Sequence, residues 1–568
     1  MKQPLVVAFG FRSKCGEDEE TVSHRSGRRC LCGRALSFHP VLLSGFRHAI
    51  ADPLDSRLVN LILEHEYRWL TGDPNHASFW SPPVFHPAKN TAAYSEILLG
   101  VAPFYWFWRA VGVVPDTAFQ LWLIVLATLN YLAGLLVLRR GLRLSWVASS
   151  LGAAIFAFGS PRLQQLNHPQ LLAGFYTLLA LYAILRLASL GDTKKPAEAR
   201  PSRQAWAYAL LFVAALTAQI AASFYLGWFL VLILAIGGAV AVATPRGRLG
   251  LGRVAIQAKF ALPISLAIGA ILLAPLVRRY LSAAGDVGYR SFEDAVPMLL
   301  RIESWIYAGP NNWLYGRLTD LGIFRDLPYE HEHRLSVGVV TAAVAIAGLV
   351  MHRRRPLVLY AAVPLAVVIL LATLLPGGVS AWRGVFEAIP GAAAIRAVCR
   401  VGMFALIPIG LGVALTAETL VRERRFGLTV GLFLVCLLEQ GATLPSYDKL
   451  AVRHRVQTLT AAIPEDREAF LYTPGAAGDF WINCHVDAMW AGLERGKPTV
   501  NGYSGNWPRY WDFFQIVLRS DEDERRLQRA LATWCDVHGI DPGSIAWIRG
   551  ASSPNSYHEE HEARKEDR

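Results

Sequence analysis

Ten apolar segments, each close to the length of a transmembrane helix, constrain the fold of this chain more than any other feature. A helix needs about 20 apolar residues to cross the ~30 Å hydrocarbon layer of a bilayer. The segments occupy residues 118–138, 146–160, 170–189, 205–222, 224–243, 258–277, 335–351, 356–375, 397–418 and 426–444. The shortest is 146–160. We therefore expect an all-α polytopic membrane protein with about ten to eleven transmembrane helices.

Composition favours a polytopic membrane protein for a chain of this length. Of the 568 residues, 53% are hydrophobic and only 18% are charged. A soluble protein of this size would need more charged residues to cover its surface. The segments are therefore expected to face lipid.

Basic residues are concentrated in every second connection between the segments. These residues are Arg139, Arg140, Arg143, Lys194, Lys195, Arg200, Arg203, Arg246, Arg248, Arg253, Arg353, Arg354, Arg355, Arg422, Arg424 and Arg425. Short loops rich in Lys and Arg stay in the cytoplasm. The stretch 51–96, the loop 278–334 and the chain from about 446 should then face outward. The net charge of +12 reflects this topology, and we expect no binding to nucleic acid.

The N-terminus does not fit this topology. An even number of spans with an outward C-terminus places the N-terminus outside as well, yet residues 1–40 contain no credible signal peptide. A missing first membrane helix would explain the mismatch, so residues 1–40 are excluded from the predicted fold. Residues 41–117 then form a first outward loop, and residues 118–445 form the transmembrane domain.

The chain changes character at about residue 446. The stretches "EAFLYT", "PTVNG" and "SIAWIRG" are typical of short strands, and they alternate with helical patterns near 485–496 and 521–538. We predict a small extracytoplasmic α/β domain over 446–550, followed by a disordered charged tail over 551–568. Cys484 and Cys535 share this domain and could form a disulfide in an oxidising compartment.

The loop "NGYSGNWP" follows one of these predicted strands. It is interpreted either as a turn that packs against its own domain or as a lip over a sugar or lipid site.

Two carboxylates, Asp52 and Asp55, open the first outward loop at positions i and i+3, on one side of a helix. Pro53 suits the first turn, and Asp52 suits the N-cap. Asp55 would lie in the first turn, where the helix dipole favours it. A capped helix is therefore one interpretation, and carboxylate chemistry at the outer membrane face is the other.

Further polar side chains follow in the outward loops. They are Glu64, His65, Glu66, His76, His86, Glu96 and His168. The first four could hold a divalent cation, with the solvated face of a helix as the alternative. We favour the helix face and assign no metal site and no certain cofactor. His86 and His168 could hydrogen-bond a sugar or be structural, and Glu96 could cap the aromatic helix predicted at 97–112, which would lie along the membrane interface.

This order of motifs resembles the GT-C class of membrane glycosyltransferases, in particular the polyprenyl-phosphate-sugar-dependent protein mannosyltransferases and aminoarabinose transferases. The corresponding pieces are Asp55, "WLTGD", "SPPVFHP" and "APFYWFWRAVG". The segment "AIRAVCRVGMF" is similar to the arginine-bearing start of a late helix in uncharacterised bacterial relatives. The acids depart from the family pattern because they are spaced D-x-x-D, where the family often has adjacent acids. The family's first membrane helix is not recognisable either, and no motif marks a residue that binds the lipid phosphate.

The resemblance implies transfer of a sugar from a polyprenyl phosphate carrier to an extracytoplasmic glycan, lipid or protein. It places the protein in the bacterial inner membrane, with its active face outside. Asp55 would be the general base, and Asp52 would orient the acceptor or share a cation. The candidate substrate-binding residues are Arg57, Arg396, Arg400, Arg278, Arg279, His86 and Glu96.

Arg396 and Arg400, spaced i and i+4, would point to one spot beside a helix N-terminus and bind the donor phosphate. An interface anchor, or a partner for a nearby carboxylate, is the alternative for this pair. Arg278 and Arg279, at the end of an earlier span, are the other candidates for the phosphate.

Two other functions remain open. A transporter or flippase of lipid-linked glycans would be expected to carry charged residues in its spans, and here only Glu439 stands out. A non-catalytic scaffold that keeps the fold but has lost the chemistry is the third hypothesis.

Overall fold

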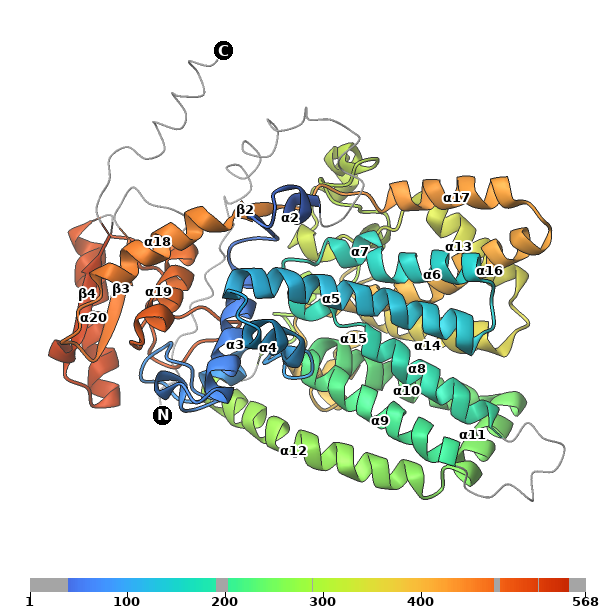
Figure 1. The fold of residues 1–568 in the computed structure, drawn as a ribbon, viewed down its shortest axis with the longest axis horizontal. Coiled ribbons are helices and arrows are strands. Elements are labelled where there is room, and N and C mark those ends of the chain that lie inside the picture. Colours follow the sequence, from blue (N-terminus) through green and yellow to red (C-terminus); the bar gives the residue numbers. More distant parts are fainter. Residues whose placement is uncertain (1–38, 191–202, 289, 475–480, 519, 551–568) are drawn as a thin grey trace, which may run out of the picture.

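The computed structural model describes residues 39–190, 203–288, 290–474, 481–518 and 520–550. Long helices run side by side through one part of the molecule, and the C-terminal helices and strands gather at one end of it (Figure 1). The predicted features of residues 1–38 and 551–568 lie outside the described residues.

Within the described residues, six helices are long and apolar enough to cross a membrane. They are α5 with its π-helical end (Pro115–Gly141), the α8 span (Pro169–Ser189), α9 (Arg203–Ala222), α10 (Phe224–Ala243), α12 (Ala261–Val287) and the α16 span (Val398–Arg422). The structure thus agrees with the helical membrane protein that the sequence predicts.

The other four expected spans form shorter helices. They are α6 (Trp146–Phe158), α13 (Val339–Met351), α14 (Pro356–Ala372) and α17 (Phe426–Glu439). Helices of 13 to 17 residues fall short of the usual length for crossing a bilayer. The full count of ten spans therefore stays a prediction.

The α16 span lies at the centre of the helical part, and α12 lies at its edge. Of the apolar window in the α16 span 83% is buried inside the protein, against 22% for α12. A Cβ atom on Gly152 of α6 would collide with the carbonyl oxygen of Gly410 in α16. Such small residues let membrane helices approach closely.

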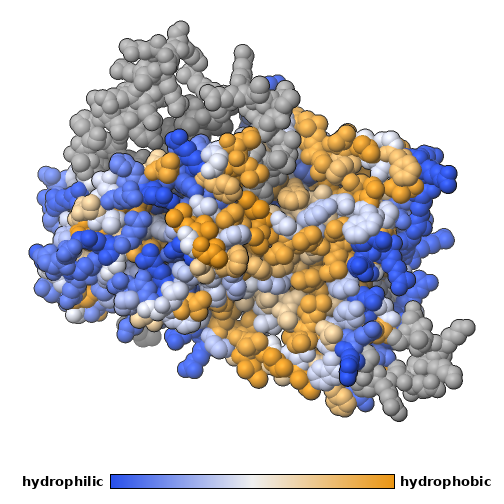
Figure 2. Space-filling model, in the orientation of Figure 1, coloured by the Kyte–Doolittle hydropathy of each residue, from blue (hydrophilic) through white to orange (hydrophobic). Residues whose placement is uncertain are grey.

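Exposed apolar side chains cover the helical part. Ile271 and Leu272 of α12 are 71% and 66% exposed, and Figure 2 shows hydrophobic residues gathered in a band between hydrophilic ends. The basic helix α11 (Pro245–Gln257) lies at the end of the bundle opposite the C-terminal region (Figure 1). This arrangement separates the basic connections from the acidic stretch.

The 41–117 segment forms a cap over one end of the bundle. Its elements are α2 (His39–Leu43), β1 (His48–Ile50), α3 (Asp55–Leu70), η3 (Pro74–His76), η4 (Thr91–Tyr94) and α4 (Ala102–Ala110). The helix expected at 97–112 is α4, and its Phe107 is 58% exposed. Tyr105 and Arg109 of α4 donate hydrogen bonds to the carboxylate of Glu64 in α3, which fixes the two helices together.

The C-terminal region, residues 446–550, contains the predicted mixture of helices and strands. Its elements are β2 (Ser446–Asp448), α18 (Lys449–Ala462), β3 (Ala469–Thr473), α19 (Trp481–Arg495), α20 (Asp521–His538), η15 (Pro542–Ser544) and β4 (Ile545–Arg549). Strands β3 and β4 pair in parallel, whereas the strand expected at "PTVNG" makes only a single bridge at Thr499. Cys484 and Cys535 are both buried, and they do not form the disulfide that the sequence allowed.

The C-terminal region is joined tightly to the 41–117 segment. Strand β2 pairs antiparallel with β1, with Tyr447 opposite Ala49. The Trp490 indole donates to the carbonyl oxygen of Arg57 at 3.2 Å. One hydrophobic cluster extends through both parts of the chain, so they pack as a unit.

The remaining short helices connect the spans. They are α7 (Ser160–Leu163), η6 (Pro169–Leu172), α15 (Trp382–Ala388), η13 (Ala392–Ala394) and, in the long 278–334 loop, η8 (Val296–Met298), η9 (Glu303–Trp305), η10 (Gly316–Asp320), η11 (Gly322–Phe324) and η12 (Glu330–His333). The last helical turns before α16 form η14 (Val398–Ala405).

Candidate active site

Four charged side chains from separate segments meet beside the start of α3. His168 Nδ1 lies 2.9 Å from Asp55 Oδ2, and His168 Nε2 lies 3.3 Å from Glu332 Oε1. The Arg400 Nε donates to Glu332 Oε2 at 3.0 Å. Asp55 begins α3, His168 precedes η6, Glu332 is in η12 and Arg400 is in η14. We call this set the charged chain.

The charges along the charged chain alternate in sign, and these neighbouring charges set the protonation states of His168 and Asp55. Burial and the charge of Arg400 lower the pKa of His168, but its hydrogen bonds to Asp55 and Glu332 outweigh them and raise it to about 9. Both ring nitrogens therefore carry protons at neutral pH. Burial raises the pKa of Asp55, yet His168, Tyr503 and Arg400 together hold it below its usual value. Asp55 is consequently ionised.

Asp55 is the member of the charged chain that is most open to its surroundings. Its side chain is 27% exposed, against 2% for Glu332 and 10% for Arg400. Its Oδ1 accepts a hydrogen bond of 2.6 Å from the Tyr503 hydroxyl. Two oxygens with about four acceptor sites leave room for a further donor. A reacting hydroxyl can therefore approach Asp55 but not Glu332.

Asp52 lies just before α3 and supports its first turn. Its Oδ1 accepts hydrogen bonds from the backbone N–H groups of Leu54 and Asp55, at 2.8 and 2.9 Å. Burial, together with the neighbouring Asp55 charge, raises the pKa of Asp52 to about 6. The two acids therefore differ, because Asp55 stays ionised under acidic conditions that protonate Asp52.

Arg396 and Arg400 do not form the expected i,i+4 pair on one helix. The helical turns begin at Val398, so Arg396 precedes them and is exposed. The two arginines instead flank Tyr225. The Arg396 backbone N–H donates to the Tyr225 hydroxyl at 3.2 Å, and the Arg400 guanidinium lies 5.0 Å from the centre of the Tyr225 ring.

Arg396 lies within electrostatic reach of the charged chain. Burial and the Asp55 charge raise the pKa of Tyr503, while the Arg396 charge opposes this rise. Among the described residues, no carboxylate forms an ion pair with Arg396. Arg290 also lies near Arg396, and it donates to the carbonyl oxygen of Gly505 at 3.2 Å. The loop that carries Tyr503 thus has two guanidinium groups beside it.

The remaining predicted residues lie outside the charged chain. Arg57 is 2.5 Å from Asp487 Oδ1 in a buried ion pair. Arg278 and Arg279 are exposed on α12, and Arg279 lies over the Trp80 ring. His86 is half-buried, and its carbonyl oxygen accepts from the Trp534 indole.

Glu96 supports α10. Its Oε1 accepts from the Ser223 hydroxyl at 2.9 Å and from the Tyr225 backbone N–H at 3.1 Å, at the start of that helix. It therefore caps α10 and not the aromatic helix predicted at 97–112, and the charge of Arg400 also acts on its carboxylate.

The residues weighed as cation ligands separate into different contacts. Glu64 accepts from Arg68, Tyr105 and Arg109, and His65 pairs with His76 at 2.7 Å. Within the described ranges, the group of three that could hold a metal ion is His168, His331 and Glu332, whose ligand atoms lie within 4.8 Å of one another. A metal there would have to displace protons from His168.

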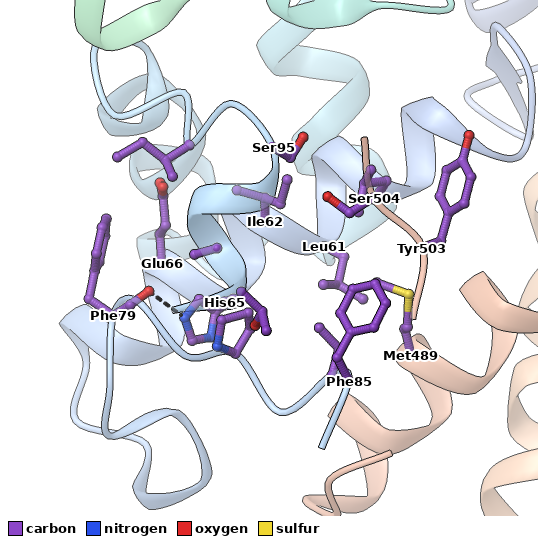
Figure 3. Close-up of a pocket in the computed structure, with 16 residues that line it drawn as sticks. Leu61, Ile62, His65, Glu66, Phe79, Phe85, Ser95, Met489, Tyr503 and Ser504 are labelled. Carbon is purple, nitrogen blue, oxygen red and sulfur yellow. Dashed lines mark hydrogen bonds between the residues drawn. The ribbon is translucent and has the colours of Figure 1, made fainter. Parts of the chain in front are cut away.

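A small cavity lies next to Tyr503 (Figure 3). Its volume is about 30 Å³, enough for about one water molecule. Glu66 lines it beside Ser95 and Ile62, and burial raises the pKa of Glu66 well above its usual value. This neutral and narrow space is too small for a sugar.

Sequence reasoning missed Glu332, Tyr503 and Arg290. Glu332 belongs to "EHEHR" in the long 278–334 loop, where five charged or titratable residues in succession were the available signal. Tyr503 belongs to "NGYSGNWP", which was singled out as a loop without a named residue. No local pattern distinguishes Arg290 from other loop arginines.

The structure is similar to two solved transferases. The arabinofuranosyltransferase AftD from Mycobacteria has 15% identity and a TM-score of 0.49, with 82% of this chain and 31% of that chain covered. The Archaeoglobus fulgidus oligosaccharyltransferase has 12% identity and a TM-score of 0.45, with 79% and 60% covered. This chain thus spans less than a third of the AftD chain. No protein-family model matches the chain, and no curated protein does. Similarity at this level does not assign a family.

Proposed function

We propose that this protein is a membrane glycosyltransferase that moves a sugar from a polyprenyl phosphate carrier to a hydroxyl on an extracytoplasmic glycan, lipid or protein. The observation that carries the proposal is the charged chain. It joins Asp55, from the acidic opening of the first loop, to Arg400, from the start of a late span, through His168 and Glu332. These positions are remote in the sequence, yet they surround one partly exposed carboxylate.

Asp55 is the general base in this mechanism. The acceptor oxygen forms a bond to the anomeric carbon, the bond from that carbon to the phosphate oxygen breaks, and the phosphate leaves with the electron pair. The proton of the hydroxyl passes to Asp55, which His168 and Tyr503 hold in place. A carboxylate with a lowered pKa takes this proton late, when the new bond has made the hydroxyl strongly acidic.

Arg396 binds the donor phosphate in this proposal. Arg400 is committed to Glu332, so it positions the charged chain. Arg396 is exposed near Tyr503, and guanidinium groups form strong charge-assisted hydrogen bonds with phosphate. Arg290 adds positive charge on the same side.

A divalent cation is not needed for this arrangement. Glu332 is already neutralised by Arg400 and His168, and both imidazole nitrogens act as donors. The residues therefore fit a proton-bearing cluster better than a metal site.

Asp55→Asn tests the proposed base. The amide keeps the size of the side chain but removes its basicity, so turnover should fall by at least ~10²–10⁴-fold, while binding of the lipid donor persists. Asp320→Asn is the matched control, because Asp320 is an exposed acid in a loop. Turnover and donor binding would be measured in one membrane preparation.

The alternatives give different results in the same preparation. Near-normal turnover in Asp55→Asn would refute the base assignment. Wild-type protein that binds the donor without turning it over would indicate a scaffold, and movement of the donor across the membrane without transfer would indicate a flippase. Glu439, the acid noted in the last span, accepts hydrogen bonds from Thr341 and Val340 backbone N–H groups. These bonds give Glu439 a structural role.

A further inference from the structure

A polar cavity lies beside α3, at the junction of the 41–117 segment and the C-terminal region. Its volume is about 190 Å³. An engineered cavity of roughly 150 Å³ in another protein binds benzene, so this one has room for a six-membered ring. Its lining comes from α3, the start of α5, β2, α18 and α19.

Lys449 places a buried positive charge at this cavity. The residue is 8% exposed, and its ammonium group donates to the Thr117 hydroxyl at 2.7 Å and to the Gln120 side-chain oxygen at 3.0 Å. Both acceptors are neutral, and in the described part of the chain no carboxylate forms an ion pair with Lys449. An ammonium group has three donors. One N–H therefore remains available, and an anion beside it would offset the cost of burying the charge.

Most of the other charged groups at the cavity already form ion pairs. Arg57 is held by Asp487, and one nitrogen of Arg453 donates to Asp116 Oδ2 at 2.9 Å. Arg453 is one-third exposed and keeps further donors of its guanidinium group. Two carboxylates, Asp116 and Glu494, also line the space. Because Asp487 neutralises Arg57, these carboxylates equal the remaining cations, Lys449 and Arg453, in number. The case for an anion therefore rests on the Lys449 ammonium group, which has no ion-pair partner among the described residues, and not on a net charge of the cavity.

Aromatic side chains complete the cavity and link it to the acidic pair. Tyr447 and Trp490 line it, and the described residues provide no hydrogen-bond partner for the Tyr447 hydroxyl. Tyr447 lies opposite Ala49 in the β1–β2 pair, and the chain after β1 leads directly to Asp52. The charges of Arg57, Asp116 and Asp52 all act on this hydroxyl.

We infer that this cavity binds one anionic sugar ring of the acceptor, with Lys449 and Arg453 on its carboxylate or phosphate and Tyr447 on a ring hydroxyl. The inference rests on the proposed function and specifies the acceptor as an anionic saccharide. The donor phosphate has its own cation in Arg396, which lies on the Tyr503 side of α3. Two separate anion sites therefore serve the two substrates.

The test measures binding of D-glucuronate to the full chain in lipid nanodiscs by saturation-transfer NMR. D-glucose is the neutral counterpart, and glucose 1-phosphate distinguishes phosphate from carboxylate recognition. Lys449→Gln should weaken glucuronate binding roughly tenfold or more, the loss expected for a charge-assisted hydrogen bond. Arg529→Gln, which removes an exposed charge from α20, should have no effect.

Equal binding of glucuronate and glucose, or unchanged binding in Lys449→Gln, would overturn the inference. If Lys449→Gln does not fold, the half-buried Arg453→Gln carries the same test. Asp55→Asn should keep glucuronate binding. If Lys449→Gln weakens glucuronate binding while Asp55→Asn stays active, the cavity site is retained and the proposed transfer mechanism is refuted. If Asp55→Asn is inactive and Lys449→Gln binds glucuronate normally, the transfer mechanism is retained and the cavity site is refuted.

Discussion

Replacing His168 by glutamine tests the charged chain through its dependence on pH. The pKa of His168 is about 9 in the folded protein, against 6.5 for the ordinary side chain. A raised pKa means that the imidazolium stabilises the fold fully below pH 6.5 and that this contribution is lost as the pH rises through 9. The difference between 9 and 6.5 corresponds to about 3 kcal/mol, at ~1.4 kcal/mol per pH unit. The side chain is only 16% exposed, so solvent screening reduces this value little.

The assay compares melting temperatures at pH 6.5 and pH 9.5 in one detergent. One kcal/mol shifts the midpoint by roughly 2–4 °C in domains of 150–250 residues and by less in longer chains, so we expect wild type to lose about 3–6 °C. His168→Gln should already be less stable at pH 6.5 and should lose less on the alkaline step. The exposed His454→Gln should behave as wild type. An alkaline loss in His168→Gln as large as that in wild type would refute the assigned protonation of the chain.

Three further variants separate chemistry, binding and stability. Tyr503→Phe removes the hydrogen bond to the proposed base. A hydrogen bond to a charged group is worth ~1.5–3 kcal/mol, so turnover should fall by about ten- to a hundredfold while donor binding persists. Kinetics under saturating donor would measure this loss. Arg396→Gln should weaken donor binding by a similar factor in a lipid-binding assay, with the exposed Arg325→Gln as control. Arg57→Met should lower the free energy of unfolding by ~1–3 kcal/mol, because Asp487 loses one guanidinium partner and keeps Arg455 at 3.1 Å; a fully stable variant would contradict the role of the pair.

The sequence predicted the helical membrane class because hydropathy reports the length and polarity of each segment directly. It could not fix the number of spans, since short helices such as α6 depend on packing against α16 rather than on their own length. It suggested a separate C-terminal domain from the change in composition. The shared core between this region and the 41–117 segment arises from contacts between residues far apart in the chain, which composition does not record.

At the site, position along the chain did not predict that Asp55 and Arg57 face different partners. An α-helix turns by about 100° per residue, so a residue two positions further on points to nearly the opposite side. Arg57 accordingly meets Asp487, while Asp55 meets His168 and Tyr503. Glu332 was missed because only folding brings its loop to His168.

The pairing of β1 with β2 has a consequence for biosynthesis. Residues 48–50 leave the ribosome early, and their partners at 446–448 follow only after every apolar segment has been synthesised. Tyr503 emerges later still. A nascent chain can therefore insert its helices while Asp55 still lacks its phenolic partner, and catalytic competence should arise only near the end of translation. A ribosome stalled after α17 would then hold an inserted but inert polypeptide, which supplying the C-terminal region as a separate fragment should activate.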